Sequence, residues 1–297
     1  MLFIRSLKIY RSVTGLALKH LWSQPRLFTP FLYLAVINFA GLALIYYSPQ
    51  WPVNLLLAAP IRAFYGEAAL HYPYNLEYLP QIFRSWRLVT EIVCASLLTG
   101  VTISMYNQYS KKMSLRFGKN FKISFNRYAA LVLFSFLIVA PPYILNRSLI
   151  YFISDRLHEN SGFFLHMGRI KWLVAMGGIN LLANLCLETL LLYVPVAVIV
   201  VNSGFWRSCR ESLKKVFKYF LPSLLIILLP TVAIVIMEIM ASAVPRLIQV
   251  FNPEISLVVV GTGIVVAFLA NVLIAVSSTI LFLNIHEPET EKEAAGA

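Results

Sequence analysis

Three polar side chains share one stripe of an otherwise apolar segment. Asn180, Asn184 and Glu188 follow one another at intervals of four residues, which places all three on the same face of a helix. An ionisable residue inside such a segment is a candidate for function, because its burial in lipid is costly. The stripe either lines a polar or proton-linked path or supplies hydrogen bonds between helices, worth about 0.6 kcal/mol each on average. We favour the hydrogen-bonding interpretation.

Two further acids lie inside apolar segments. Glu91 is only a few residues into its segment, so we expect its side chain to reach the lipid headgroups, whereas Glu238 lies deeper in the outward half of another. Both are weaker candidates for a functional group than Glu188.

Catalytic and metal-binding motifs are not found in the sequence. It contains no HExxH, GxSxG, Walker A or GxGxxG pattern, and its five histidines show no helical metal-site spacing. Cys94, Cys186 and Cys209 are far apart and form no CxxC pair. We therefore expect no catalytic residue, no metal and no cofactor, and we expect that the chain is not an enzyme.

The composition is that of a membrane protein. Hydrophobic residues make up 59% and charged residues 13% of the chain, whereas a soluble domain carries roughly 25% charged residues. Its mean hydropathy is +0.74. So few polar residues cannot cover the surface of a soluble fold. The sequence predicts an all-α integral membrane protein.

Six segments have the roughly 20 apolar residues that a spanning helix needs. They are residues 27–47, 88–107, 128–153, 172–201, 220–243 and 255–285. Together they predict one transmembrane bundle over residues 1–286, followed by a short, acidic, disordered cytoplasmic tail at 287–297.

The basic residues predict the orientation of the bundle. With the N-terminus in the cytoplasm, 17 of the 25 Lys and Arg residues fall on the cytoplasmic side. This split predicts that both termini are cytoplasmic, in a bacterial or archaeal cytoplasmic membrane. Because the charges lie in short connections between spans, they do not indicate a nucleic-acid partner.

The first and third basic connections have amphipathic helical patterns. In the third, the predicted apolar face consists of Phe205, Cys209, Leu213, Val216 and Phe220. The side chains expected to contact lipid headgroups are Arg5, Lys8, Lys19, Arg207, Arg210, Lys214 and Lys218. The middle connection, 111–127, is equally basic, but Gly118 weakens its helical pattern. These patterns are typical of helices lying on the anionic cytoplasmic leaflet, unless they only set topology.

The outer connection 48–85 is long for a helical bundle and rich in aromatic residues. Its candidate contact residues are Trp51, Tyr65, Tyr72, Tyr74 and Tyr78. The loop is interpreted as a re-entrant or surface-lying cap, as a docking face for a protein partner, or as an aromatic belt at the headgroups.

The chain also shows a coarse three-fold pattern. A basic amphipathic segment, a proline-bearing span and a return span recur over residues 1–108, 109–202 and 203–286, which predicts a repeat of three hairpins. The segments Leu21-Trp22-Ser23-Gln24-Pro25 and Val216-Phe217-Lys218-Tyr219-Phe220 resemble the six-span membrane domain of some glycerophosphodiester phosphodiesterases and its stand-alone relatives. The soluble phosphodiesterase domain is not in this sequence, so the resemblance implies no catalytic residue.

Two functional hypotheses follow from the sequence. The favoured one is a non-catalytic polytopic membrane protein that organises or binds lipid, membrane protein partners, or both. The alternative is a transporter or exporter permease subunit that works with a separate ATPase. The small number of intramembrane polar residues favours the first, because a substrate path needs polar groups along its length.

Overall fold

The computed structural model describes residues 2–141, 144, 178 and 181–295, which lie almost entirely in helices. No strand occurs in these ranges. Five helical segments are long and apolar enough to cross a membrane: Pro25–Tyr46, Tyr74–Ser110, Leu181–Val201, Phe220–Ser242 and Ile255–Ile285. Each overlaps one of the six predicted spans. The predicted all-helical class is confirmed.

The remaining predicted span, 128–153, is described only in part. The helix Tyr128–Pro141 follows α6 (Phe117–Phe125) at a bend of 72°, and the two together are long and apolar enough for one further span. Most of residues 142–153, and residues 172–177 and 179–180 of the predicted fourth span, lie outside the described residues.

The predicted outer loop 48–85 is mostly helical. The first half of the chain consists of α1 (Leu2–Ser23), a 3₁₀ turn (Pro25–Phe28), α2 (Thr29–Tyr46), α3 (Asn54–Tyr65), a second 3₁₀ turn (Glu67–Leu70), α4 (Tyr74–Thr90), a π-helical turn (Glu91–Ala95) and α5 (Ser96–Ser110). Tyr74 and Tyr78, predicted as loop residues, therefore lie on α4. Leu57 and Ile61 on α3 pack into the bundle, which explains how this connection is ordered.

The second half of the chain ends in one very long helix. Its elements are α9 (Val194–Val196), a π-helical turn (Ala197–Val201), α10 (Phe205–Lys218), α11 (Phe220–Ser242), α12 (Val244–Val250) and α13 (Ile255–Ala295). Because α13 continues to Ala295, the prediction of a disordered tail from residue 287 was wrong. No glycine or proline break precedes this segment between Ile264 and His286.

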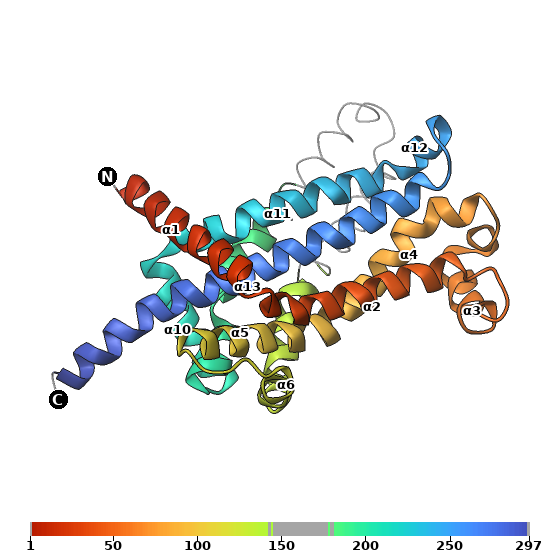
Figure 1. The fold of residues 1–297 in the computed structure, drawn as a ribbon. Coiled ribbons are helices and arrows are strands. Elements are labelled where there is room, and N and C mark those ends of the chain that lie inside the picture. The colour runs from red at the N-terminus through yellow and green to blue at the C-terminus, as the bar shows by residue number, and fades with distance from the viewer. Residues whose placement is uncertain (1, 142–143, 145–177, 179–180, 296–297) are drawn as a thin grey trace.

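Helix α13 is the axis of the bundle. It contacts α1, α2, α4, α5 and α11 (Figure 1). Both chain ends, α1, α6 and α10 lie towards one end of the molecule, called the terminal end below, and α3 and α12 lie at the other, the distal end (Figure 1). One apolar core lies among α1, α5, α10, α11 and α13, and a second joins α2, α3, α4 and α13.

The outer surface of α11 is apolar. Its most hydrophobic window has a mean hydropathy of 2.7, yet only 17% of that window is buried inside the protein. Large side chains such as Leu229, Ile236 and Ile239 are more than half exposed. A soluble protein rarely exposes so continuous an apolar surface, whereas a bilayer covers it.

Helices α2 and α4 approach each other closely at one glycine. A Cβ atom added at Gly41 would lie 2.1 Å from Nε1 of Trp86. Only a residue without a side chain allows the indole ring to lie there, so Gly41 sets the distance between α2 and α4.

Candidate functional site

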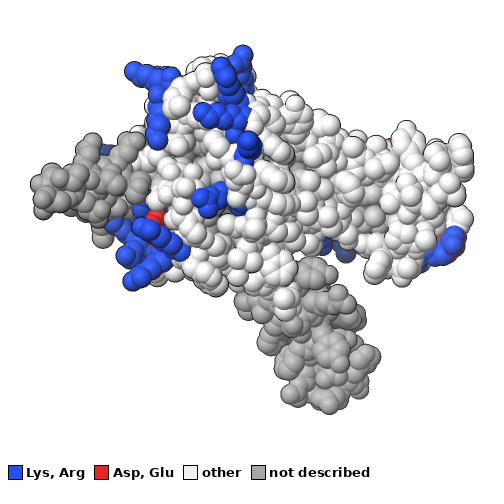
Figure 2. Space-filling model, turned by 90° about the horizontal axis from the view of Figure 1, so that it is seen from below, with Lys and Arg blue, Asp and Glu red and all other residues white. Residues whose placement is uncertain are grey.

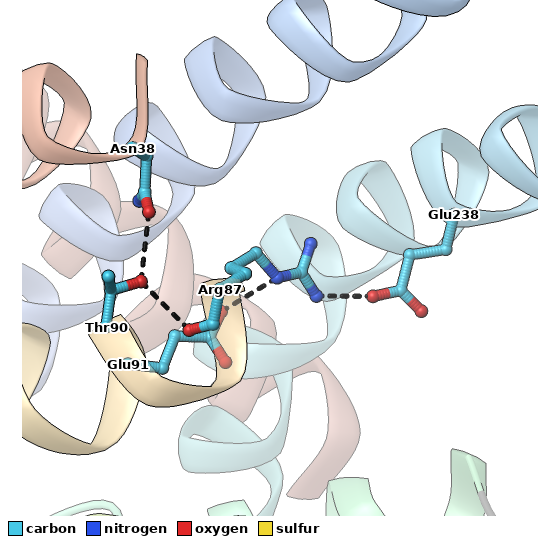
Figure 3. Close-up of polar contacts among 5 residues, drawn as sticks. All are labelled: Asn38, Arg87, Thr90, Glu91 and Glu238. Carbon is cyan, nitrogen blue, oxygen red and sulfur yellow. Dashed lines mark hydrogen bonds and ion pairs between the residues drawn. The ribbon is translucent and has the colours of Figure 1, made fainter. Parts of the chain in front are cut away.

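One arginine and two glutamates from different helices form an ion cluster in the distal half of the bundle. Nε of Arg87, on α4, lies 3.1 Å from Oε1 of Glu91, and Nη2 of Arg87 lies 2.5 Å from Oε1 of Glu238 on α11 (Figure 3). The three side chains are 25%, 36% and 42% exposed, respectively. The guanidinium group therefore joins α4 to α11 through its charge-assisted contact with Glu238, whereas Glu91 lies one turn further along the same helix.

The expected position of Glu91 needs correction. Its carboxylate pairs with Arg87 one helical turn earlier, rather than extending alone to the headgroups. Arg87, just before the predicted span 88–107, belongs to α4 and to this cluster. The signal that identifies the pair is the four-residue spacing of opposite charges on one helix.

A buried hydrogen bond anchors the cluster to α2. Oγ1 of Thr90 lies 2.9 Å from Oδ1 of Asn38 and 3.0 Å from the carbonyl oxygen of Arg87, so its single proton is shared between two acceptors (Figure 3). Both side chains are buried. Asn38 on α2 is thus bonded to Thr90 on α4.

The helix changes its winding at the cluster. Residues Glu91–Ala95 form a π-helical turn between α4 and α5. A π-turn inserts one residue into an α-helix, which rotates the side chains that follow, and such turns occur frequently at functional sites. Here the turn begins at the acid that pairs with Arg87.

Two members of the predicted polar stripe lie in the segment Leu181–Val201. Asn184 and Glu188 are partly buried, whereas Asn180 lies outside the described residues. The hydrogen bonds between described residues include none made by Asn184 or Glu188. Glu91 and Glu238, by contrast, meet at one arginine, and no sequence spacing predicted the contact of Glu238.

A groove runs along α4 beside this cluster. Its outer part has a volume of about 410 Å³ and lies between α4, the end of α11 and the start of α12. Its inner part, about 50 Å³, is bounded by α4, α11 and α13 and contains Arg87 and Glu238. Pro80, Arg84 and Ala241 line both parts, which therefore form one continuous groove.

The predicted lipid-contact residues lie on α1 and α10 at the terminal end. All seven of the predicted basic side chains are exposed. Figure 2 shows Lys and Arg side chains gathered towards one end of the molecule, with an almost uncharged surface beyond them. The helical nature of the basic segments is confirmed for α1, α10 and, despite Gly118, for α6. Their position on a membrane surface stays a prediction.

The inward face of α10 is more polar than predicted, although Phe205, Cys209 and Val216 of the predicted apolar face do pack against the core. Ser208, Ser212, Lys215 and Val216 are buried, whereas Phe220 is 41% exposed. Oγ of Ser212 donates to the carbonyl oxygen of Leu190 (2.8 Å) and accepts from the backbone N–H of Tyr193 (3.2 Å).

The Ser212 hydroxyl supplies hydrogen bonds to backbone groups that a break in the neighbouring helix leaves unpaired. Pro195 has no N–H, so the helix that ends near Leu191 cannot continue its backbone bonds past this point. A hydroxyl from a neighbouring helix replaces the missing partners. The serine spacing on α10 therefore serves helix packing and not lipid contact.

Histidine and cysteine side chains at the terminal end also have packing roles. Burial, with a smaller contribution from Lys19, lowers the pKa of His20, whose Nδ1 lies 2.8 Å from the Tyr106 hydroxyl. Burial raises the pKa of the Cys209 thiol. In the described part of the chain, no three His, Cys, Asp or Glu side chains lie close enough together to hold a metal ion.

The predicted aromatic residues of the outer connection are divided between two environments. Trp51, Tyr72 and Tyr74 are exposed at the distal end. Tyr65 and Tyr78 pack against the smaller core, and the Tyr65 hydroxyl lies 2.9 Å from Oγ of Ser85 on α4. Tyr65 therefore forms part of the groove wall.

Comparisons with protein-family models, curated protein sequences and solved structures find no match to this chain. Its function is therefore argued from its own residues.

Proposed function

We propose that this chain is a non-catalytic integral membrane protein that binds anionic lipid through its terminal end. In this proposal the bundle crosses the membrane six times, and the terminal end, with both chain termini, faces the cytoplasm. The three helices α1, α6 and α10 lie on the anionic leaflet. The three-hairpin repeat and the likeness to the membrane domain of phosphodiesterases are part of the same proposal.

The observation that carries the proposal is the pairing of exposed aromatic and cationic side chains at the terminal end. Trp22 is 89%, Trp206 81% and Phe217 74% exposed, although large aromatic side chains are normally buried. Arg207 and Lys218 are exposed on the same helix as the last two. An aromatic ring in the headgroup layer beside a cation that reaches lipid phosphate is the arrangement of an interfacial helix.

Removing the charges of α10 in the full-length chain tests this proposal. The test variant replaces Arg207, Arg210, Lys214 and Lys218 with Gln, and the control replaces the exposed distal residues Arg62 and Arg246 with Gln. Both are reconstituted in nanodiscs of equal phosphatidylglycerol and phosphatidylcholine, and the lipid retained after detergent extraction is counted by mass spectrometry.

We expect the α10 variant to retain several-fold less phosphatidylglycerol, because each cation near an anionic surface contributes about 1 kcal/mol. The difference should shrink as salt screens exposed charge. Wild-type retention by the α10 variant, or an equal loss in the distal control, would contradict the proposal.

The orientation is tested by labelling single cysteines in a chain whose three natural cysteines are replaced. Tyr72 and Lys112 are both exposed, at opposite ends of the bundle. We expect Tyr72→Cys to react with an impermeant maleimide on intact cells and Lys112→Cys to react only after permeabilisation. The reverse pattern would invert the topology.

A permease function is the second candidate, because two acids from apolar segments pair with a single arginine and a third, Glu188, is partly buried in another such segment. Glu188→Gln separates the two candidates, since an amide keeps the shape but cannot exchange a proton in a transport cycle. We expect this variant to be stable in detergent and to support growth of a deletion strain. A stable but inactive variant would favour transport.

A further inference from the structure

The groove along α4 changes from polar to apolar along its length. Its outer part is lined by the side chains of Tyr65, Glu77, Gln81, Arg84, Ser85 and Ser242. Its inner part is lined mainly by Phe83, Ile234, Met237, Val260 and Ile264. A groove with one polar end and one apolar end fits an amphiphile better than a wholly polar solute.

Two opposite charges stand in the outer part. Arg84 and Glu77 lie on α4, seven residues apart, which is two helical turns and roughly 10 Å along the axis. Neither makes a salt bridge to another residue in the part of the chain that the structure describes. The outer groove thus presents one free cation and one free anion along a single helix face.

The inner part already has its charges paired. Arg87 holds Glu238 at 2.5 Å and Glu91 at 3.1 Å, so its positive charge is already paired with two carboxylates (Figure 3). The carboxylate of Glu238 repels a second anion. A phosphate group is therefore stabilised at Arg84 and not deeper, whereas a hydrocarbon chain can follow the apolar wall towards α13.

We propose that the groove binds one phospholipid with an amine-bearing zwitterionic headgroup. The phosphate contacts Arg84, the primary ammonium contacts Glu77, and one acyl chain lies along the crevice between α4, α11 and α13. The charge order along α4 carries this assignment. A phosphate and an ammonium joined by a two-carbon linker, with a hydrogen bond at each end, match two charges separated by two helical turns.

This distal site is separate from the lipid contacts proposed for the terminal end. The terminal end offers many exposed cations and selects net negative charge, whereas the groove offers one cation and one anion. An anionic lipid without an amine leaves Glu77 without a partner in the groove. Substitutions in α10 therefore alter phosphatidylglycerol retention, and substitutions in the groove alter phosphatidylethanolamine binding.

Native mass spectrometry of the delipidated full-length protein tests the headgroup assignment. Phosphatidylethanolamine, phosphatidylglycerol and phosphatidylcholine are titrated separately. We expect one phosphatidylethanolamine to bind about tenfold more tightly than either other lipid, because only its ammonium donates hydrogen bonds to Glu77. Arg84→Gln should weaken this binding by about tenfold, and Glu77→Gln should remove the preference for the amine.

Two glycines on α13 provide a matched test of the acyl crevice. Gly263 lines the crevice, and a Cβ added there would lie 3.9 Å from the Met237 Cβ atom, an ordinary contact. Gly261 faces Phe39 instead, at 3.7 Å. Gly263→Leu should fill the crevice and lower phosphatidylethanolamine affinity several-fold, whereas Gly261→Leu should leave it unchanged. Arg62→Gln serves as the charge control at the distal end.

Several results would overturn the assignment. Equal binding of the three lipids, or wild-type affinity in Arg84→Gln, would show that the groove does not discriminate between lipid headgroups. Full competition by soluble phosphoethanolamine at matched concentration would show that the acyl chain contributes nothing. Equal affinity losses in Gly261→Leu and Gly263→Leu would mean that the crevice is not occupied.

Discussion

The two ends of the bundle use polar residues in opposite ways. At the terminal end, the polar side chains inside the bundle are mostly neutral, with Lys215 the buried exception, and most charges lie outside. At the distal half, charged side chains from α4 and α11 face each other beside an open groove. A neutral buried network fixes helices with little penalty, whereas a charged and partly open cluster leaves room for a ligand.

The network between α5 and α6 illustrates the terminal end. Asn120 is fully buried; it accepts from Oγ of Ser104 at 2.6 Å and donates to Oε1 of Gln108 at 2.9 Å and to the carbonyl oxygen of Arg116 at 2.8 Å. Its amide thus uses both its donor and its acceptor side. Beside Arg87, the neutral side chains of Asn38 and Thr90 form a single bonded pair instead.

The largest effect on stability is expected at the close contact between α2 and α4 in the distal half. Gly41→Val should lower the free energy of unfolding by about 3 kcal/mol or more, because its Cβ would overlap the Trp86 indole at 2.1 Å. The measurement is thermal unfolding in detergent, followed by tryptophan fluorescence.

Gly15→Ala is the control, since a Cβ at this position of α1 meets no atom within 4 Å. It should be neutral or slightly stabilising, because alanine favours a helix. If Gly41→Val unfolds at the same temperature as Gly15→Ala, the contact between α2 and α4 is not tight, and the distal half is looser than described.

The second-largest effect on stability is expected in the hydrogen-bond network between α5 and α6. Asn120→Leu should lower the free energy of unfolding by about 2 kcal/mol, because Ser104 and Gln108 lose their buried partner. Ser110→Ala is the control, since its exposed hydroxyl bonds only the carbonyl oxygen of Asn107 in its own helix. Unchanged stability in Asn120→Leu would remove the contrast between the two ends.

The sequence predicts the positions of the spans well, but it predicts poorly which helices and side chains pack against one another. Apolar length alone identifies helices such as Phe220–Ser242, because the bilayer imposes it. Single-segment periodicity identifies α1 and α10 as amphipathic, but it does not show that Ser208 and Ser212 face inward. The partners of Ser212 lie 19 and 22 residues earlier, on a helix broken by Pro195, whereas Ser208 bonds to Ser203 and Gly204 just before α10.

The candidate site shows the same limit. Each of Glu91, Glu188 and Glu238 is recognisable as an acid inside an apolar segment. The convergence of Glu91 and Glu238 on Arg87 depends on how α4 and α11 pack together. A single sequence carries no information on that packing, whereas the local Arg87–Glu91 spacing does predict one contact.

A smaller effect is expected from the ion cluster itself. Arg87→Gln should lower the free energy of unfolding by about 1 kcal/mol, because the three side chains are only partly buried and solvent or lipid headgroups compensate for the lost pairs. Arg84→Gln, one turn earlier on α4, should leave the stability of the lipid-free protein unchanged. If Arg87→Gln is also neutral, the cluster does not hold α4 and α11 together.

The smallest effect is the pH dependence of stability that His20 causes at the terminal end. His20 links α1 to α5, since its Nδ1 lies 2.8 Å from the Tyr106 hydroxyl and its ring packs edge-on against Tyr109 at 5.1 Å. Burial, and secondly Lys19, lowers the pKa of His20 below its usual value of 6.5. The folded state therefore binds fewer protons than the unfolded state in the pH range just below 6.5, so stability increases with pH there. This contribution is complete above pH 6.5 and is lost as the pH falls through the lowered pKa.

We expect the unfolding temperature of the wild-type protein to decrease between pH 7.5 and 5 by more than that of His20→Gln, which keeps an acceptor for Tyr106 but does not titrate. His71→Gln, at the exposed surface of the distal end, should follow the wild-type curve. Parallel curves for wild type and His20→Gln would show that α1 docks on α5 independently of the histidine, and the terminal end would then be held by its neutral network alone.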